Sequence, residues 1–69
     1  MINEKLKNIR ESNHLTYKEM ALKLGICKAY YWQLEHGNRG LYYEMALRIA
    51  NIFQLKPDDL FYDYYKKRH

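Results

Sequence analysis

Residues 15–37 constrain the fold of this chain more than any other stretch, because they carry the signals for two short helices and the turn between them. Thr16 can accept a hydrogen bond from the Glu19 amide while the Glu19 carboxylate accepts one from the Thr16 amide, which is typical of a helix start. Gly25 can adopt the left-handed conformation that ends such a helix. A second helix is expected between about residues 27 and 37.

Apolar residues at helical spacing give each of these two helices an inner face. Met20, Ala21 and Leu24 share one face of the first, and Tyr31 and Leu34 continue an inward stripe on the second. Ala21 is also small enough to let two helices cross closely. Two helices joined by a turn of this kind form a helix-turn-helix, whose second helix can lie in the major groove of DNA.

A further helix is expected before this pair. Residues 2–12 place apolar side chains on one face, at Ile2, Leu6 and Ile9. Asn13 and His14 should close this helix, because Asn and His tolerate the left-handed conformation better than most residues.

Two more helices are expected in the C-terminal half. One starts near Leu41 or Tyr42 and carries an inward stripe made of Tyr43, Ala46, Leu47, Ile49, Ala50 and Phe53. The other begins with Pro57, which suits a first helical turn, and turns Leu60 and Phe61 inward. The chain of 69 residues is therefore predicted to be all-α, with one five-helix domain over residues 1–65 and a basic tail over residues 66–69.

Charge and cysteine content narrow the functional classes. Twelve Lys and Arg against eight Asp and Glu give a net charge of +4, which favours an anionic partner such as nucleic acid. One cysteine cannot form an internal disulfide, which favours a reducing cytoplasm. The sequence has neither an apolar run of membrane-spanning length nor the apolar core of a signal peptide. We therefore expect a cytoplasmic protein without a membrane partner, associated with the nucleoid when it is bound to DNA.

Residues along most of the chain follow an ordered pattern. They are Leu6, Ile9, Arg10, Leu15, Thr16, Ala21, Leu24, Gly25, Ile26, Tyr30, Leu34, Glu35, Gly37, Glu44, Leu47, Ile49, Ala50, Asp58, Leu60 and Phe61. This pattern resembles the Cro/lambda-repressor-like helix-turn-helix family, also called the Xre family, over about residues 2–61. The resemblance implies a compact lambda-repressor-like domain that binds specific double-stranded DNA as a homodimer, usually to repress transcription, in bacteria, phages or mobile elements.

The outer face of the second motif helix carries the candidate base-reading residues. Lys28 could donate to guanine, Gln33 could pair with adenine, and Ala29 could pack on a thymine methyl group. The resemblance implies base contacts at these three positions and at Cys27, where the family usually has a Ser or Thr cap. The alternative is that Lys28 and Gln33 are simply a solvated face.

Candidate phosphate-contacting residues flank that helix. They are Thr16 and Tyr17, at a helix start where free amides point outward, and His36, Asn38 and Arg39 in or near the following loop. The family usually has Gln where this chain has Tyr17, and a Tyr cannot brace the recognition helix through an amide. For Arg39 the alternative is an ordinary loop charge.

The resemblance also implies an ion pair between Arg10 and Glu35 that orients the recognition helix. If the pair is partly buried, removing one partner would leave the other charge without compensation. The alternative is two exposed surface charges that contribute little.

Aromatic residues near the C-terminus exceed what one small core requires. Leu55, Pro57, Phe61, Tyr62, Tyr64 and Tyr65 form the candidate homodimer patch. A homodimer would match a palindromic operator whose half-sites lie about one DNA turn apart. The alternative is that these tyrosines cover the first helix.

Enzymatic and ligand-binding functions are not supported. Cys27, His14 and His36 lack an organised oxyanion site and lack the paired spacing of metal ligands, so we expect no catalytic activity, metal, cofactor or small-molecule ligand. The main alternative to DNA binding is a protein-interaction module, an inhibitor or adaptor on the same fold, that uses Tyr30, Trp32 and the C-terminal tyrosines. Trp32 could pack on a sugar or thymine methyl group, contact a protein, or fold back along the domain.

Overall fold

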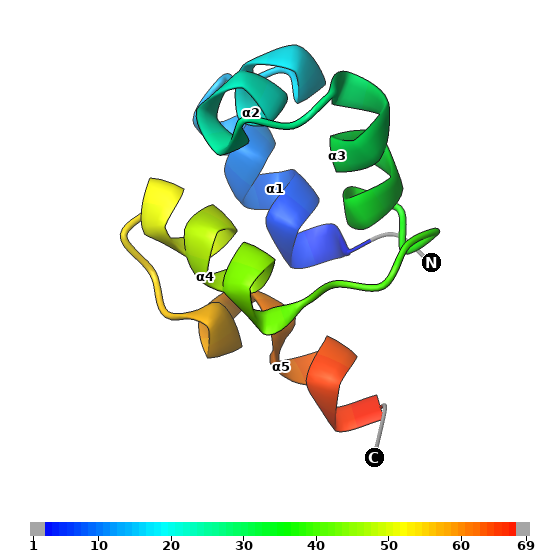
Figure 1. The fold of residues 1–69 in the computed structure, drawn as a ribbon. Coiled ribbons are helices and arrows are strands. Elements are labelled where there is room, and N and C mark those ends of the chain that lie inside the picture. The colour runs from blue at the N-terminus through cyan, green and yellow to red at the C-terminus, as the bar shows by residue number, and fades with distance from the viewer. Residues whose placement is uncertain (1–2, 68–69) are drawn as a thin grey trace.

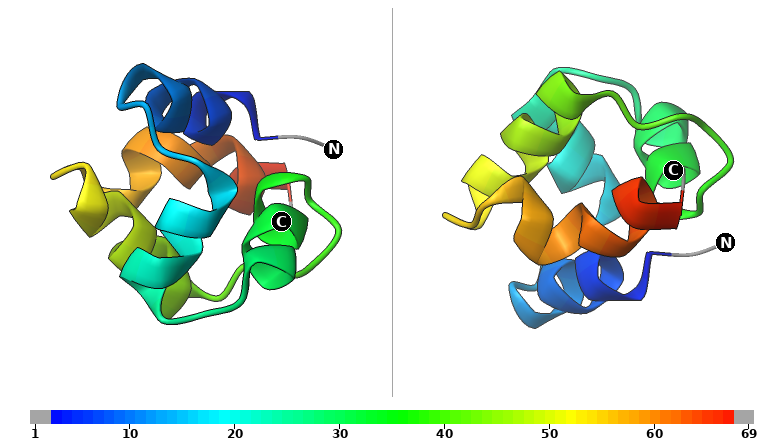
Figure 2. Two further views of the ribbon diagram at one scale, coloured as in Figure 1. Left: turned by 90° about the horizontal axis from the view of Figure 1, so that it is seen from above. Right: turned by 90° about the horizontal axis from the view of Figure 1, so that it is seen from below.

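The computed structural model describes residues 3–67, apart from the side chains of residues 63–65 and 67, and this part of the chain contains five α-helices and no strand (Figure 1). The helices are α1 (Glu4–Ser12), α2 (Tyr17–Leu24), α3 (Lys28–Glu35), α4 (Tyr43–Ile52) and α5 (Pro57–Lys67). The all-α prediction is confirmed. In Figure 2, seen from below, α5 crosses between α1 and α4.

The core draws its apolar side chains from all five helices. The buried ones are Leu6, Met20, Ala21, Leu24, Tyr31, Leu34, Ala46, Ile49, Ala50, Leu60 and Phe61. The inner faces predicted for the two motif helices are therefore confirmed, and Ala21 is only 3 % exposed. Burial of these faces fixes α2 and α3 against each other and leaves the opposite face of α3 outside the core.

The first helix begins at Glu4, two residues later than predicted. Asn3 caps it, because its Oδ1 accepts from the Leu6 amide at 3.0 Å, which is the role that Asn commonly takes before a helix. Asn3 also donates its backbone N–H to the Glu35 carbonyl at 2.8 Å and its side-chain amide to the Leu60 carbonyl at 3.3 Å. One residue thus joins the start of α1 to the end of α3 and to α5. The predicted inward residue Ile2 lies outside the described residues.

Local signals set the ends of α1 and α2 as predicted. The capping box is complete, with Thr16 N–H donating to the Glu19 carboxylate at 2.9 Å and Glu19 N–H donating to the Thr16 hydroxyl at 3.1 Å. Gly25 ends α2 with φ +70°, and His14 after α1 has φ +57°. Gln54 after α4 has the same φ as His14, which was not predicted because Gln rarely takes this conformation.

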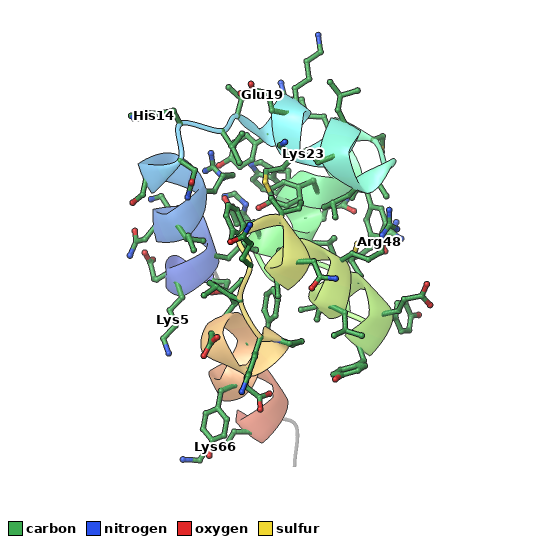
Figure 3. All side chains as sticks on the ribbon, turned by 90° about the vertical axis from the view of Figure 1, so that its left-hand side faces the viewer. Lys5, His14, Glu19, Lys23, Arg48 and Lys66 are labelled. Atoms are coloured by element: carbon green, nitrogen blue, oxygen red, sulfur yellow. The ribbon has the colours of Figure 1, made fainter. Side chains whose placement is uncertain are left out.

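The predicted inward stripe of α4 is correct in its middle and wrong at its start. Ala46, Ile49 and Ala50 are buried, whereas Tyr43 is 61 % exposed. Tyr43 is the first residue of the helix, and side chains lean toward the N-terminal end of a helix, so this ring extends past the core. Arg48 from α4 donates to the Leu24 carbonyl and so holds the end of α2; Figure 3 shows Arg48 reaching away from the α1 side.

Candidate nucleic-acid interface

The outer face of α3 presents the predicted base-reading residues to solvent. Cys27, Lys28 and Ala29 are exposed and Gln33 is half-buried. Cys27 occupies the N-cap position and makes no side-chain cap hydrogen bond, as expected of a thiol, which is a weak acceptor. Ala29 and Gln33 are four residues apart and therefore share one face of α3.

The inner face of α3 carries a buried polar network. The Glu35 side chain is 0 % exposed, and its carboxylate accepts from Arg10 Nε at 2.8 Å and from Arg10 Nη2 at 3.2 Å. The Tyr31 hydroxyl donates to the same carboxylate at 3.0 Å, and Arg10 Nη1 donates to the Leu15 carbonyl at 2.8 Å. The structure therefore brings Arg10 and Glu35 together as the resemblance implied. The resulting network of hydrogen bonds links α1, the α1–α2 loop and α3.

Burial and hydrogen bonding shift the pKa values of two side chains in this network. The hydrogen bond to the Glu35 carboxylate raises the pKa of Arg10, which keeps the guanidinium charged. Burial, together with the neighbouring Glu35 charge, raises the pKa of Tyr31 and keeps its hydroxyl a donor. Both effects keep Arg10 and Tyr31 in the protonated forms that donate to the Glu35 carboxylate.

Tyr17 covers this network from the side of α2. Its ring lies 4.3 Å from the Arg10 guanidinium carbon, and its centroid lies 6.2 Å from that of Tyr31 and 6.1 Å from that of His36. A cation above an aromatic face is held by the ring quadrupole. Tyr17 thus braces α3 through ring contacts, a role that sequence reasoning missed because it considered only an amide in this position.

The predicted phosphate-contacting residues lie at the two ends of the motif. The Thr16 amide donates to the Glu19 carboxylate, as the predicted capping box requires, so it is not available to a phosphate. His36 is the C-cap of α3, with its ring stacked on Trp32 at a centroid distance of 3.8 Å. Asn38 and Arg39 follow in an exposed loop, where the Asn38 backbone N–H donates to the Gln33 carbonyl at 2.9 Å.

A side-chain cluster that the sequence did not predict includes Gln33, one of the predicted base-reading residues. Arg39 Nε donates to Gln33 Oε1 at 3.0 Å, and the Arg39 guanidinium carbon lies 4.9 Å from the centre of the Tyr30 ring. Tyr30 is half-buried and packs against the core. The loop charge is thereby attached to α3.

The C-terminal patch is smaller than predicted. Phe61 is 1 % exposed and belongs to the core, because α5 packs this face against the other helices. Leu55 and Pro57 are half-buried, and Tyr62 is 53 % exposed. The side chains of Tyr64 and Tyr65 lie outside the described residues.

No three His, Cys, Asp or Glu side chains among the described residues are grouped so as to hold a metal ion. In the described part of the chain, no helix is both long enough and apolar enough to cross a membrane.

A five-helix domain with a tight α2–α3 pair and a polar outer face on α3 has the architecture of helix-turn-helix proteins. Comparison with protein families agrees, since the family described as "Helix-turn-helix domain" matches residues 3–66, and the chain belongs to this family. The chain is also 38 % identical over 60 residues to the "Uncharacterized HTH-type transcriptional regulator YqaE" of Bacillus subtilis (strain 168). The match covers 87 % of this chain and 52 % of the relative, so the chain spans about half the length of that protein.

Proposed function

We propose that this chain is a sequence-specific double-stranded DNA-binding transcriptional regulator of the Cro/lambda-repressor-like (Xre) kind, acting as a repressor. One observation carries the proposal: α3 exposes Lys28 and Ala29 outward while the buried Arg10–Glu35 pair fixes its inner face. A recognition helix must be held rigidly for a few side chains to reach base edges in register. The family membership and the name of the Bacillus relative support the same function.

The base-reading roles follow from hydrogen-bonding chemistry. With α3 in the major groove, Lys28 donates to guanine O6 or N7, and Ala29 packs against a thymine methyl group. Gln33 contacts a base one helical turn after Ala29. Cys27 lies at the entry of the helix, where its small thiol lets the backbone approach the DNA.

The phosphate-contacting roles belong to groups at the rim of α2 and α3. The proposed contacts come from the α2 start at Thr16 and Tyr17, from the His36 ring and from the loop residues Asn38 and Arg39. Because the Thr16 amide already donates to Glu19, we assign its contact to the hydroxyl. These contacts set the register of α3 on the duplex without reading sequence.

We also propose that two copies of the chain bind one palindromic operator. A two-fold symmetric dimer presents two α3 helices at half-sites about one DNA turn apart. Tyr62 is the described aromatic residue of the C-terminal patch with the largest exposure, and we place it at the dimer contact together with Tyr64 and Tyr65. The function needs no catalytic step, metal, cofactor or small-molecule ligand.

Selection of bound duplexes from a randomised DNA pool tests this function. The purified chain at about physiological salt should enrich a palindrome with half-sites about one turn apart. Its affinity for that site should fall steeply as salt rises, because phosphate contacts release counterions. Failure of the folded chain to enrich any motif would refute sequence-specific binding.

Trp32 supports a second candidate function, a protein-interaction module on the same fold. Its side chain is 39 % exposed on α3, and aromatic residues of this kind often anchor protein interfaces. Tyr30 is less suited to such a role, since Arg39 covers its ring. An aromatic protein interface would weaken much less with salt than DNA binding does, so a salt titration separates the two functions.

A further inference from the structure

Arg39 is held at two points on the recognition helix. Its Nε donates to Gln33 Oε1 at 3.0 Å, and its guanidinium lies over the Tyr30 ring, 4.9 Å from the centroid. Tyr30 packs against the core, so the ring is a fixed support. Two contacts to different groups restrict a long side chain far more than one exposed hydrogen bond does.

The hydrogen bond changes what Gln33 can offer to a base. A free Gln presents one acceptor, Oε1, beside two donors on Nε2, and this acceptor–donor pair matches adenine N6 and N7. Here Arg39 donates a charge-assisted hydrogen bond to one lone pair of Oε1 and places a positive charge beside the other, which disfavours a second donor there. The Nε2 donor is therefore the group that Gln33 presents most favourably to a base.

Arg39 adds further donors to the same edge. Its contacts with Gln33 and Tyr30 use Nε and the face of the guanidinium, and neither uses the terminal N–H groups. The combined edge is therefore made of donors and carries a positive charge. Guanine presents two acceptors, O6 and N7, in the major groove, whereas adenine presents one acceptor and one donor.

We propose that Gln33 and Arg39 read guanine as one unit, in which Arg39 is the positioning residue that switches Gln33 away from adenine. The inference rests on the proposed DNA-binding function. Arg39 then contributes to base specificity in addition to any phosphate contact, and the Tyr30 ring holds the Arg39 guanidinium in position.

The test compares base preferences of the wild-type chain, Gln33→Ala and Arg39→Met in the same randomised-pool selection, followed by competition between single duplexes. Lys5→Met, which removes one exposed cation from α1, is the matched control (Figure 3). At the operator position whose preference Gln33→Ala abolishes, the wild type should favour guanine over adenine by about tenfold. Arg39→Met should favour adenine there and leave the other positions unchanged, and Lys5→Met should keep the wild-type preference.

A modified base provides a second measurement at that position. Replacement of guanine by 7-deazaguanine removes the N7 acceptor, so it should weaken wild-type binding by about tenfold and Arg39→Met binding much less. Thermal unfolding of each variant checks that it is folded. Arg39→Lys, which retains charge but not the planar fork, should recover overall affinity without the full guanine preference.

Three results would overturn the inference: adenine preferred by the wild type at the Gln33 position, an equal loss on all sequences for Arg39→Met, or no position affected by Gln33→Ala. Each of these three results is obtained only when the wild-type chain has enriched a motif, so the proposed function would still hold. A folded wild-type chain that enriches no motif would overturn the proposed function and this inference together.

Discussion

The carboxylate of Glu35, in the last turn of α3, lies 2.8 Å from Nε of Arg10 on α1, and the two side chains are 0 % and 7 % exposed. Removal of either partner of a charge pair buried to this degree is destabilising, because each compensates the desolvation of the other. The pair therefore fixes α3 against α1 and makes the position of α3 sensitive to either residue.

Arg10→Met should lower the free energy of unfolding by about 3–5 kcal/mol, because it leaves the Glu35 carboxylate buried with only Tyr31 as a side-chain donor. Chemical denaturation measures this loss. The double variant Arg10→Met with Glu35→Leu should be more stable than Arg10→Met alone, since it removes the uncompensated charge. Additive losses in the double variant would show that the two residues are not coupled.

Tyr31→Phe should cost about 1–2 kcal/mol, because it deletes a buried hydroxyl that donates to a carboxylate. Tyr42→Phe, at a ring that is 76 % exposed, is the matched control and should change stability by less than about 0.5 kcal/mol. Equal effects of the two substitutions would contradict the buried network.

Tyr31 should also make the free energy of unfolding depend on pH. Burial raises the pKa of Tyr31 above its ordinary value of 10.0, so the unfolded chain loses this proton at lower pH than the folded chain does. The stabilisation is complete below pH 10 and declines as pH rises above it. The difference in unfolding free energy between the wild type and Tyr31→Phe should therefore shrink in alkali, which denaturation at pH 8 and at higher pH values measures.

Thr16→Ala should cost about 1 kcal/mol by removing the acceptor of the capping box, whereas Thr16→Ser should retain most of the stability. Hydrogen bonding to Thr16 lowers the pKa of Glu19, so its contribution is present above the ordinary value of 4.5 and is lost as pH falls through the folded pKa. Glu19→Gln should therefore differ from the wild type at neutral pH and converge with it in acid. A constant difference across this range would argue against the Glu19 cap.

Lys28→Ala should relax base preference at one operator position by about 1–3 kcal/mol, because Lys28 is exposed at the start of α3. Competition between duplexes that differ at single positions measures the change. Lys5→Ala, on α1 in Figure 3, removes the same charge from an exposed position and should leave every preference intact. A uniform loss on all sequences would place Lys28 on phosphate instead.

Tyr62→Glu should weaken binding to the full palindrome more than binding to an isolated half-site, because it places a charge in the proposed dimer contact. Light scattering on the free chain and on its DNA complex counts the copies. One copy per palindrome for the wild type would contradict the homodimer.

Local chemistry explains why the central part of the fold could be predicted. The α2 helix is delimited by the Thr16–Glu19 box and by Gly25, and these signals involve residues close in sequence. The start of α1 also had a local signal, since Asn3 directly precedes Glu4, but apolar spacing alone had extended the helix to Ile2. The left-handed Gln54 had no such signal and could not be predicted.

The candidate site, too, could be predicted from residue spacing only where the signal lies within one helix. The outward position of Lys28 followed from helical periodicity, whereas the link from Arg39 to Gln33 depends on the path of the loop after α3, which periodicity does not describe. Similarly, the brace that Tyr17 provides arises from ring contacts between α2, α1 and α3. Long-range side-chain packing of this kind is visible only in three dimensions.

Different residues of α3 attach the helix to the domain and face the solvent. Tyr31, Leu34 and Glu35 are buried, whereas Lys28 and Ala29 are exposed. Neither Lys28 nor Ala29 is joined to the Arg10–Glu35 pair, so both can be replaced without disturbing the attachment of the helix. Under the proposed function, the domain is thus suited to retargeting: new operators can be addressed by changing the outward residues on an unchanged scaffold. One short helix can therefore change the DNA sequence that it contacts while its attachment to the rest of the domain stays the same.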